Sequence, residues 1–199
     1  MAHDKNHGHP ASSGEEGSPP GSRIIDLPFR ALGDQPAFTP VGLDRFLAEP
    51  RVAVLAYVRR DGRPNQSPIW YCYDGSTLVM STVTGSPKHL ALQRDPRVTV
   101  TVQDERPPYR AAVIEGTVSL TPIEPGADPT AGIDVRYFGR LAAAEYRKMT
   151  REVYEASGLT AFRLLPTAVR GFDNTRAISR ATLAFVRVRD RLAIPRQWL

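Results

Sequence analysis

A stretch of hydroxyl, glycine and lysine residues, STVTGSPK at positions 81–88, has the composition of a phosphate site. Phosphate binds to convergent N–H and O–H donors together with a cation, and the first amides of a helix supply such donors because they have no partners within the helix. A glycine lets the backbone approach the ligand closely, and a lysine adds a full positive charge. The sequence therefore predicts an anion site made by Ser81, Thr82, Thr84, Gly85, Ser86 and Lys88.

The same residues also suit an ordinary turn between a strand and a helix, in which Ser86 caps the helix and Lys88 lies in solvent. The stretch does not have the glycine and lysine spacing of a P-loop, and no G-x-G-x-x-G follows a strand. A nucleotide-like cofactor would therefore bind here on a different scaffold.

Apolar and β-branched runs on both sides of this stretch predict the strands that would position it. Asp61-Gly62 and Asp74-Gly75 are typical of tight hairpin turns, so residues 51–83 should form three consecutive strands. Gly116 interrupts a long strand and indicates a bulge or a bend. The other expected elements are helices at 41–49, 86–94 and 131–156, and strands at 95–105, 109–122, 160–173 and 181–188.

Six or seven mostly antiparallel strands with few helices are typical of a mainly β domain whose sheet forms a closed or half-closed barrel. The chain has 199 residues, which suits a single core, and we expect that domain to span residues 31–199. Residues 1–30 are polar and show no apolar periodicity, so they are predicted to form a disordered tail.

The composition limits the compartment and the partners. The sequence shows neither a signal peptide nor an apolar segment of membrane-spanning length, so we expect a soluble, cytoplasmic protein that binds no membrane. Its one cysteine excludes an internal disulfide and a cysteine-based zinc site, and three of its four histidines lie in the tail, so no metal site is expected. The formal net charge of +5 favours an anionic partner. Because no helix-turn-helix, RNP-like strand pair or basic helix is found, nucleic acid is not expected to be that partner.

Three segments resemble the split β-barrel of the pyridoxamine 5′-phosphate oxidase-like superfamily, and within it the branch of deazaflavin-dependent oxidoreductases. These segments read EPRVAVLAYVRRDGRPNQSPIWYCYDG, STVTGSPKHLALQRDPRVTVTV and AAVIEGTVSLTP, and the resemblance covers residues 41–173. It implies an FMN-binding-like split barrel that forms a homodimer, with the cofactor site at the subunit interface. The aromatic residues suggested for that interface are Trp70, Phe138, Phe162 and Phe172.

The resemblance assigns Thr82, Thr84, Ser86 and Lys88 to the cofactor phosphate, and it places Trp70 and Tyr71 beside the cofactor ring or at the subunit interface. Relatives often carry an arginine at the position of Ser86, and either Arg94 or an arginine of the partner subunit is expected to supply that charge here. The residues assigned to the edge and face of the ring are Gln66, Ser67, Pro68 and Ile69.

The implied activity is that of a reductase that uses the deazaflavin coenzyme F420 to transfer a hydride to an unsaturated small molecule, such as the enone of a polycyclic secondary metabolite. The net positive charge favours the polyanionic deazaflavin over FMN, which shares its ring and phosphate. Tyr71 is a candidate proton donor, although buried tyrosines more often have a structural role. The alternatives are an FMN-dependent oxidoreductase and a non-catalytic module that binds flavin or heme.

Overall fold

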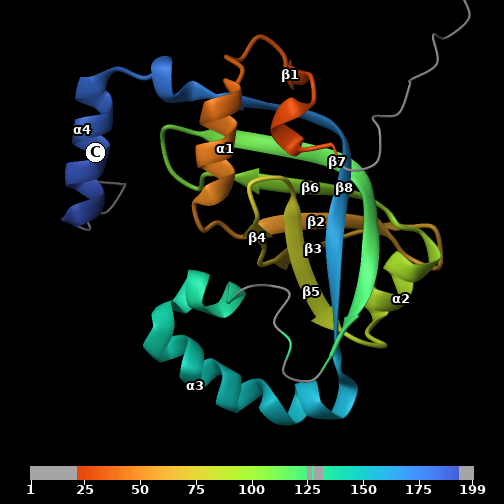
Figure 1. The fold of residues 1–199 in the computed structure, drawn as a ribbon. Coiled ribbons are helices and arrows are strands. Elements are labelled where there is room, and N and C mark those ends of the chain that lie inside the picture. The colour runs from red at the N-terminus through yellow and green to blue at the C-terminus, as the bar shows by residue number, and fades with distance from the viewer. Residues whose placement is uncertain (1–21, 125–126, 128–131, 193–199) are drawn as a thin grey trace, which may run out of the picture.

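The computed structural model describes residues 22–124, 127 and 132–192 (Figure 1). It shows one mainly β domain with four α-helices in the described part. The elements are η1 (Ile24–Asp26), β1 (Phe29–Ala31), α1 (Pro40–Ala48), β2 (Ala53–Val58), β3 (Pro64–Ile69), β4 (Cys72–Tyr73), β5 (Leu78–Val83), α2 (Pro87–Arg94), β6 (Arg97–Gln103), β7 (Arg110–Ile123), α3 (Ile133–Ser157), β8 (Leu159–Asp173), η2 (Asn174–Arg176) and α4 (Arg180–Arg191).

The strands form one sheet in the order β3-β2-β6-β7-β8-β5-β4, with β1 added alongside β8. Every pair is antiparallel except β1 and β8, which run parallel. The sheet has eight strands rather than the six or seven expected, because β1 and β4 are too short to be seen in an apolar pattern. The prediction of a mainly antiparallel β fold with helices is confirmed.

The sheet stays open between β3 and β5, where the sequence suggested a hairpin. The chain leaves the ladder at Trp70 and Tyr71, so the expected return strand is divided into β3 and β4, and only β4 pairs with β5. At this point the backbone is hydrogen-bonded to a side chain instead of to a neighbouring strand. The Tyr137 hydroxyl accepts a hydrogen bond from the Tyr71 amide at 3.1 Å and donates one to the Arg51 carbonyl at 2.6 Å. A side chain distant in sequence therefore holds the sheet open.

The long strands β7 and β8 form the centre of the sheet, and their register shifts between Glu115 and Gly116. A Cβ at Gly116 would lie 2.2 Å from the Leu165 carbonyl oxygen, so only glycine allows this close approach of the two backbones. The predicted bulge at Gly116 is confirmed.

The hydrophobic core fills the inside of the curved sheet. Side chains alternate between buried and half-buried along β2, as expected for a strand with one face on a core. Helix α1 adds Leu43, Phe46 and Leu47, all of which are buried. The largest fully buried side chains are those of Tyr71, Phe46, Phe162, Ile24, Leu43, Leu47, Leu55, Leu78, Met80, Leu92, Ile114 and Leu164.

The domain begins earlier in the chain than the predicted boundary at residue 31. Residues 22–30 belong to the fold: Ile24 is fully buried, its amide donates to the Ser76 carbonyl at 2.9 Å, and β1 pairs with β8. This boundary is hard to predict because only a few apolar residues lie in a polar region. Residues 1–21, which include the three histidines of the predicted tail, lie outside the described residues.

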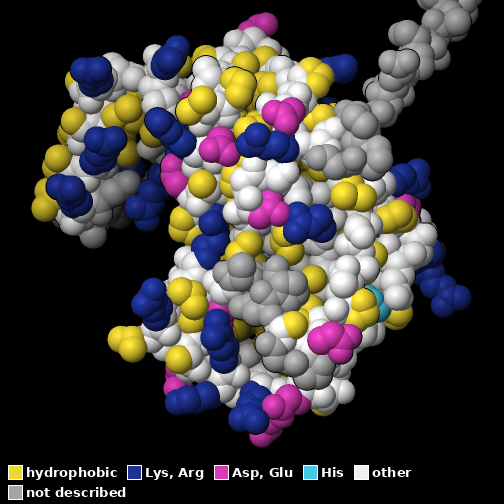
Figure 2. Space-filling view, in the orientation of Figure 1, with side chains coloured by type: hydrophobic (Ala, Val, Ile, Leu, Met, Phe, Trp, Pro, Cys, Tyr) yellow, Lys and Arg dark blue, Asp and Glu magenta, His cyan; other side chains and the backbone are white. Residues whose placement is uncertain are grey.

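The segment expected to form a last strand at 181–188 is helical. Ser179 caps α4 by accepting a hydrogen bond from the Thr182 amide at 3.1 Å, and the hydrophobic residues that follow recur at helical spacing. Figure 1 shows α4 standing apart from the sheet, and Figure 2 shows basic and hydrophobic side chains side by side on it. The prediction was wrong because it gave too much weight to the β-branched residues of the segment.

Helix α3 crosses one end of the sheet and is bent at Gly139 (Figure 1). Gly139 has φ 75° and ψ 168°, a conformation that is essentially restricted to glycine. The first turn of α3 is attached to α1, since the Arg136 guanidinium donates to the carbonyls of Leu47 and Glu49 at 3.0 and 2.8 Å. The part after Gly139 covers the opening between β3 and β5.

None of the helices in the described part of the chain combines the length and the apolar character needed to cross a membrane.

Candidate functional site

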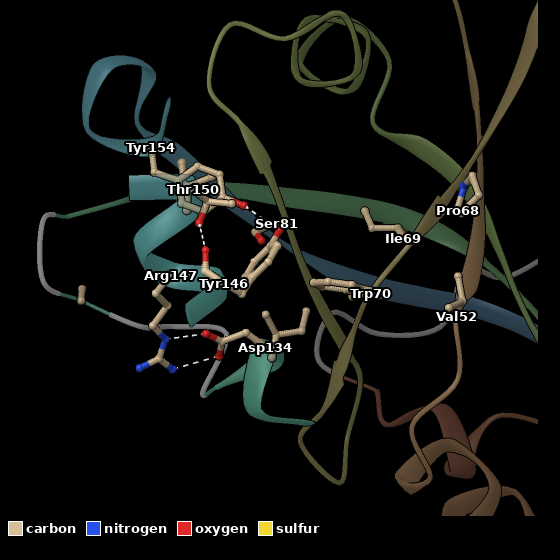
Figure 3. Close-up of a pocket in the computed structure, with 13 residues that line it drawn as sticks. Val52, Pro68, Ile69, Trp70, Ser81, Asp134, Tyr146, Arg147, Thr150 and Tyr154 are labelled. Carbon is tan, nitrogen blue, oxygen red and sulfur yellow. Dashed lines mark hydrogen bonds and ion pairs between the residues drawn. The ribbon is translucent and has the colours of Figure 1, made fainter. Parts of the chain in front are cut away.

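A cavity of about 540 Å³ lies between the open edges of the sheet and α3 (Figure 3). Among the described strands β3 pairs only with β2, and β5 has no partner beyond Val79 on the side away from β8, so both edges face the cavity with unpaired backbone groups. The described residues that line the cavity are Val52, Pro68, Ile69, Trp70, Ser81, Ala127, Ile133, Asp134, Tyr146, Arg147, Thr150, Tyr154 and Leu159.

Trp70 and Tyr146 line this cavity and belong to a larger aromatic cluster. The Trp70 ring is stacked on Tyr137, with centroids 5.1 Å apart and an angle of 16° between the planes. Phe138 and Tyr146 pack against the same indole at 5.0 and 5.5 Å. Flat, apolar rings of this kind are suited to a planar ligand.

An ion pair between Asp134 and Arg147 forms the polar side of the cavity. Nε and Nη2 of Arg147 donate to the two carboxylate oxygens of Asp134, and the Arg147 guanidinium lowers the pKa of this carboxyl group. Asp134 precedes the bend at Gly139 and Arg147 follows it, so the pair holds the two parts of α3 together across the cavity.

Two tyrosines of α3 place their hydroxyl groups together in the cavity. The hydroxyls of Tyr146 and Tyr154 are 3.2 Å apart, and Figure 3 shows them pointing toward each other. Burial raises the pKa of Tyr146 to about 12, and its hydrogen bond with Tyr154 acts in the same direction. Tyr146 is therefore a neutral phenol at physiological pH.

The turn between β5 and α2 has a well-defined hydrogen-bond pattern. The Ser86 hydroxyl caps α2 by accepting from the His89 amide at 3.2 Å, as in the alternative considered for an ordinary turn. The Gly85 amide donates to Nδ1 of the buried His89 at 3.0 Å. The Thr82 hydroxyl lies 3.2 Å from Ser86, and Thr84 pairs with Thr160 at 2.9 Å.

Lys88 does not lie fully in solvent. Its side chain is half-buried in the first turn of α2, and burial lowers the pKa of its amine. No carboxylate among the described residues forms an ion pair with it. A partly desolvated cation without a counterion at a helix N-terminus is the arrangement expected of an anion site.

The structure brings only a part of the predicted site residues to the cavity. Pro68, Ile69 and Ser81 line the cavity. The strand carrying Ser81 leads directly to the turn at residues 84–88, about 10 Å away at the rise of an extended chain. Gln66 is exposed on β3 and does not line the cavity. Thr82 lies on β5, Thr84, Gly85 and Ser86 lie in the turn that follows, and Lys88 lies in the first turn of α2. None of these residues is among the described residues that line the cavity.

Three predicted roles are wrong. Tyr71 is not placed to donate a proton in the cavity, because it is fully buried in the core and its hydroxyl donates to the Leu47 carbonyl at 3.2 Å. Arg94 lies at the far end of α2 and donates to the Val58 carbonyl at 2.6 Å rather than reaching the phosphate turn. Phe162 is fully buried in the core and contributes nothing to an exposed interface.

The residues of α3 that line the cavity were missed by the sequence analysis. Tyr146, Thr150 and Tyr154 recur every four residues and therefore share one face of the helix, a signal that was present in the sequence. Asp134 and Arg147 gave no such signal, because the bend at Gly139 brings them together.

A second, more polar groove of about 760 Å³ adjoins the cavity and shares Val52 and Pro68 with it. Arg51 and Arg110 both bind Asp104, at 2.8 and 2.5 Å, and both guanidinium groups lie over the Phe46 ring. Glu49 pairs with both arginines as well, at 2.5 and 3.8 Å, so two carboxylates balance the two guanidinium groups, and the cluster serves mainly to fix the end of α1 against the sheet.

The residues present fit a planar cofactor with a phosphate. Lys88 provides a partly desolvated cation, and the edge of β3 provides unpaired backbone donors and acceptors. The Ser67 hydroxyl on that strand is buried and has no hydrogen-bond partner among the described residues. A cavity of about 540 Å³ falls within the range of small-molecule and cofactor sites.

Comparisons with known proteins agree with this interpretation of the fold. The profile of the family described as "Pyridoxamine 5′-phosphate oxidase" matches residues 42–172. A conserved hypothetical protein, Rv2991 from Mycobacterium tuberculosis, is 22% identical with a TM-score of 0.58, covering 76% of this chain and 94% of its own. A structure titled "F420 Reductase" is 26% identical with a TM-score of 0.51, covering 63% of this chain and 94% of its own. The chain therefore belongs to the pyridoxamine 5′-phosphate oxidase family.

Proposed function

We propose that this protein is a reductase that uses the deazaflavin coenzyme F420 to reduce an unsaturated small molecule. The observation that carries the proposal is Lys88, a half-buried cation without a carboxylate partner among the described residues, in the first turn of the helix that follows the strand whose Ser81 lines the cavity. The similarity to an F420 reductase supports the choice of cofactor.

In this proposal different residues bind different parts of the cofactor. Lys88 and the hydroxyl groups of the turn would hold the phosphate, and the open edge of β3 would hold the polar edge of the ring. When bound, the deazaflavin supplies a hydride to an electron-poor carbon. The aromatic cluster and α3 would orient the acceptor and exclude water, which favours hydride transfer over side reactions.

The positive charge of the chain favours the deazaflavin over FMN. Both ligands carry the ring and the phosphate that the turn would bind, but only the deazaflavin continues into a tail with several negative charges. A net charge of +5 attracts such a ligand over a longer range, until salt screens it beyond about 8–10 Å. FMN is the alternative cofactor.

We also propose that the protein is a homodimer. The outer side of α3 exposes Leu141, Met149 and Val153, and Figure 2 shows hydrophobic side chains on the surface over this helix. Apolar side chains gathered on one exposed helix face favour burial against a partner. A second copy of the chain fits this surface, in keeping with the subunit arrangement implied by the resemblance to split barrels.

Ligand titration tests the proposed function directly. Purified protein is titrated with the deazaflavin and with FMN, and Lys88→Met is compared with Lys148→Met as the matched control. Lys148 is also a lysine on a helix, but it is 76% exposed and paired with Glu145, away from the cavity lining.

We expect the deazaflavin to bind more tightly than FMN, and Lys88→Met to weaken both about 10- to 100-fold, since a hydrogen bond to a charged group contributes roughly 1.5–3 kcal/mol. Lys148→Met should bind as the wild type does. If the wild type binds FMN as tightly as the deazaflavin, the proposed choice of cofactor is wrong. If Lys88→Met binds both ligands as tightly as the wild type does, the proposed phosphate site is wrong. Turnover of the reduced coenzyme with menadione as acceptor distinguishes a reductase from a carrier.

A further inference from the structure

We propose that Tyr146 is the proton donor of this site: its hydroxyl hydrogen-bonds to the substrate oxygen that gains negative charge and then protonates it, and Tyr154 restores the proton. The inference rests on the proposed reductase function and adds the residue that completes the reaction. It replaces Tyr71, whose hydroxyl lies in the core.

The groups that line the cavity leave few alternatives as acids. Asp134 is held ionised by Arg147, and a guanidinium does not release its proton in proteins. The Thr150 hydroxyl already donates to the Tyr146 carbonyl at 2.9 Å. Ser81 offers an aliphatic hydroxyl, which is a far weaker acid than a phenol. Among the described lining residues, the two phenols are therefore the best proton donors.

The positions of the two phenols assign different roles to them. Tyr146 packs against Trp70 and Phe138, with ring centroids 5.5 and 5.1 Å away, and both Tyr146 and Trp70 line the cavity. Tyr154 lies eight residues later on the same helix, two turns nearer the end of α3, and its hydroxyl is 3.2 Å from that of Tyr146. This contact is short enough for a proton to pass from Tyr154 to Tyr146.

Hydride adds to the electron-poor carbon of a C=C bond conjugated to a carbonyl group, a C–H bond forms, and the π electron pair moves to the carbonyl oxygen. The acceptor gains two electrons, and the deazaflavin loses two. The Tyr146 O–H bond then breaks as its proton passes to the enolate, Tyr154 reprotonates Tyr146, and water reprotonates Tyr154.

Binding of an enolate mimic tests this role without the cofactor. The probe is 4-nitrophenolate, a planar ring with an oxyanion, and 4-nitroanisole is its neutral counterpart of similar shape. Binding is followed through quenching of Trp70 fluorescence in a Trp198→Phe background, because the chain has two tryptophans. Tyr146→Phe and Tyr154→Phe are compared with Tyr109→Phe, whose ring is exposed and does not line the cavity.

We expect the wild type to prefer the anion, and Tyr146→Phe to lose on the order of 10- to 100-fold in affinity for it, with little change for 4-nitroanisole. Tyr154→Phe should lose less, and Tyr109→Phe nothing. Circular dichroism confirms that each variant is folded. If the wild type shows no preference for the anion, or Tyr146→Phe keeps it, the assignment is wrong. The anion-binding test contains no coenzyme, so its outcome is independent of the coenzyme titration. If the protein fails to bind the coenzyme but still prefers the anion, only the proposed function is rejected.

Discussion

At the scale of the residue, the half-buried Lys88 is expected to cost the fold stability. Burial lowers the pKa of its amine, so the folded state disfavours the charged form relative to the unfolded chain. The unfolded state therefore binds more protons between the two pKa values, and the stability of the wild type should rise as the pH increases toward about 10.4, the ordinary lysine value.

We predict that Lys88→Met keeps or raises the melting temperature at neutral pH, by up to about 3 °C, while it weakens ligand binding. The gain should shrink as the pH approaches 10, because the wild-type amine is then increasingly neutral in both states. Thermal unfolding across a pH series, without ligand, measures this. A variant that is clearly less stable at neutral pH would mean that Lys88 has a structural partner.

At the scale of the element, α3 depends on its bend. Gly139 adopts φ 75° and ψ 168°, where other residues are strained by about 1–3 kcal/mol. Nothing lies within 4 Å of a Cβ built there, so any cost of a side chain comes from the backbone alone. The bend lets Asp134 reach Arg147 and lets Tyr146 reach Trp70.

We predict that Gly139→Ala lowers the free energy of unfolding by about 1–3 kcal/mol, or else straightens the helix and moves Tyr146 away from Trp70. Denaturant unfolding measures the first effect, and Trp70 fluorescence in the Trp198→Phe background reports the second. Ala144→Gly, at an exposed helical position after the bend, is the control for a simple change of helix propensity. No change in either measurement would show that the bend is not required.

Local features were predicted better than contacts between distant elements, except for α4, whose β-branched residues suggested a strand. Ser86 caps α2 as the sequence indicated, because a cap depends on neighbours three residues away. The opening between β3 and β5 depends on Tyr137, 66 residues from its partner Tyr71 in the chain. For the same reason the cavity wall on α3 was missed. Of the predicted site residues that line the cavity, Pro68 and Ile69 came from the family resemblance and Ser81 from the hydroxyl-rich stretch at 81–88.

At the scale of the whole molecule, the exposed face of α3 should determine the assembly. We predict that the protein runs as a dimer, with twice the 22.0 kDa of one chain, in size-exclusion chromatography with light scattering. Leu141→Asp should shift it to the monomer, because Leu141 is 91% exposed and would become buried between subunits. Leu90→Asp, at an exposed leucine on α2, is the control. A dimer that tolerates Leu141→Asp would place the interface elsewhere.

The pairing of β1 with β8 has a practical consequence for work with this protein. Phe29–Ala31 pair with Val169–Gly171 of β8, the longest strand. Without β1 the backbone groups on that side of Val169–Gly171 would be unpaired. A shortened chain that starts at Ala31, the predicted start of the domain, removes Phe29 and Arg30 from β1 and also removes Ile24. Such a chain would expose unpaired backbone groups of β8 to other molecules and aggregate on expression. A chain that keeps the residues from Ser22 onward should stay monodisperse.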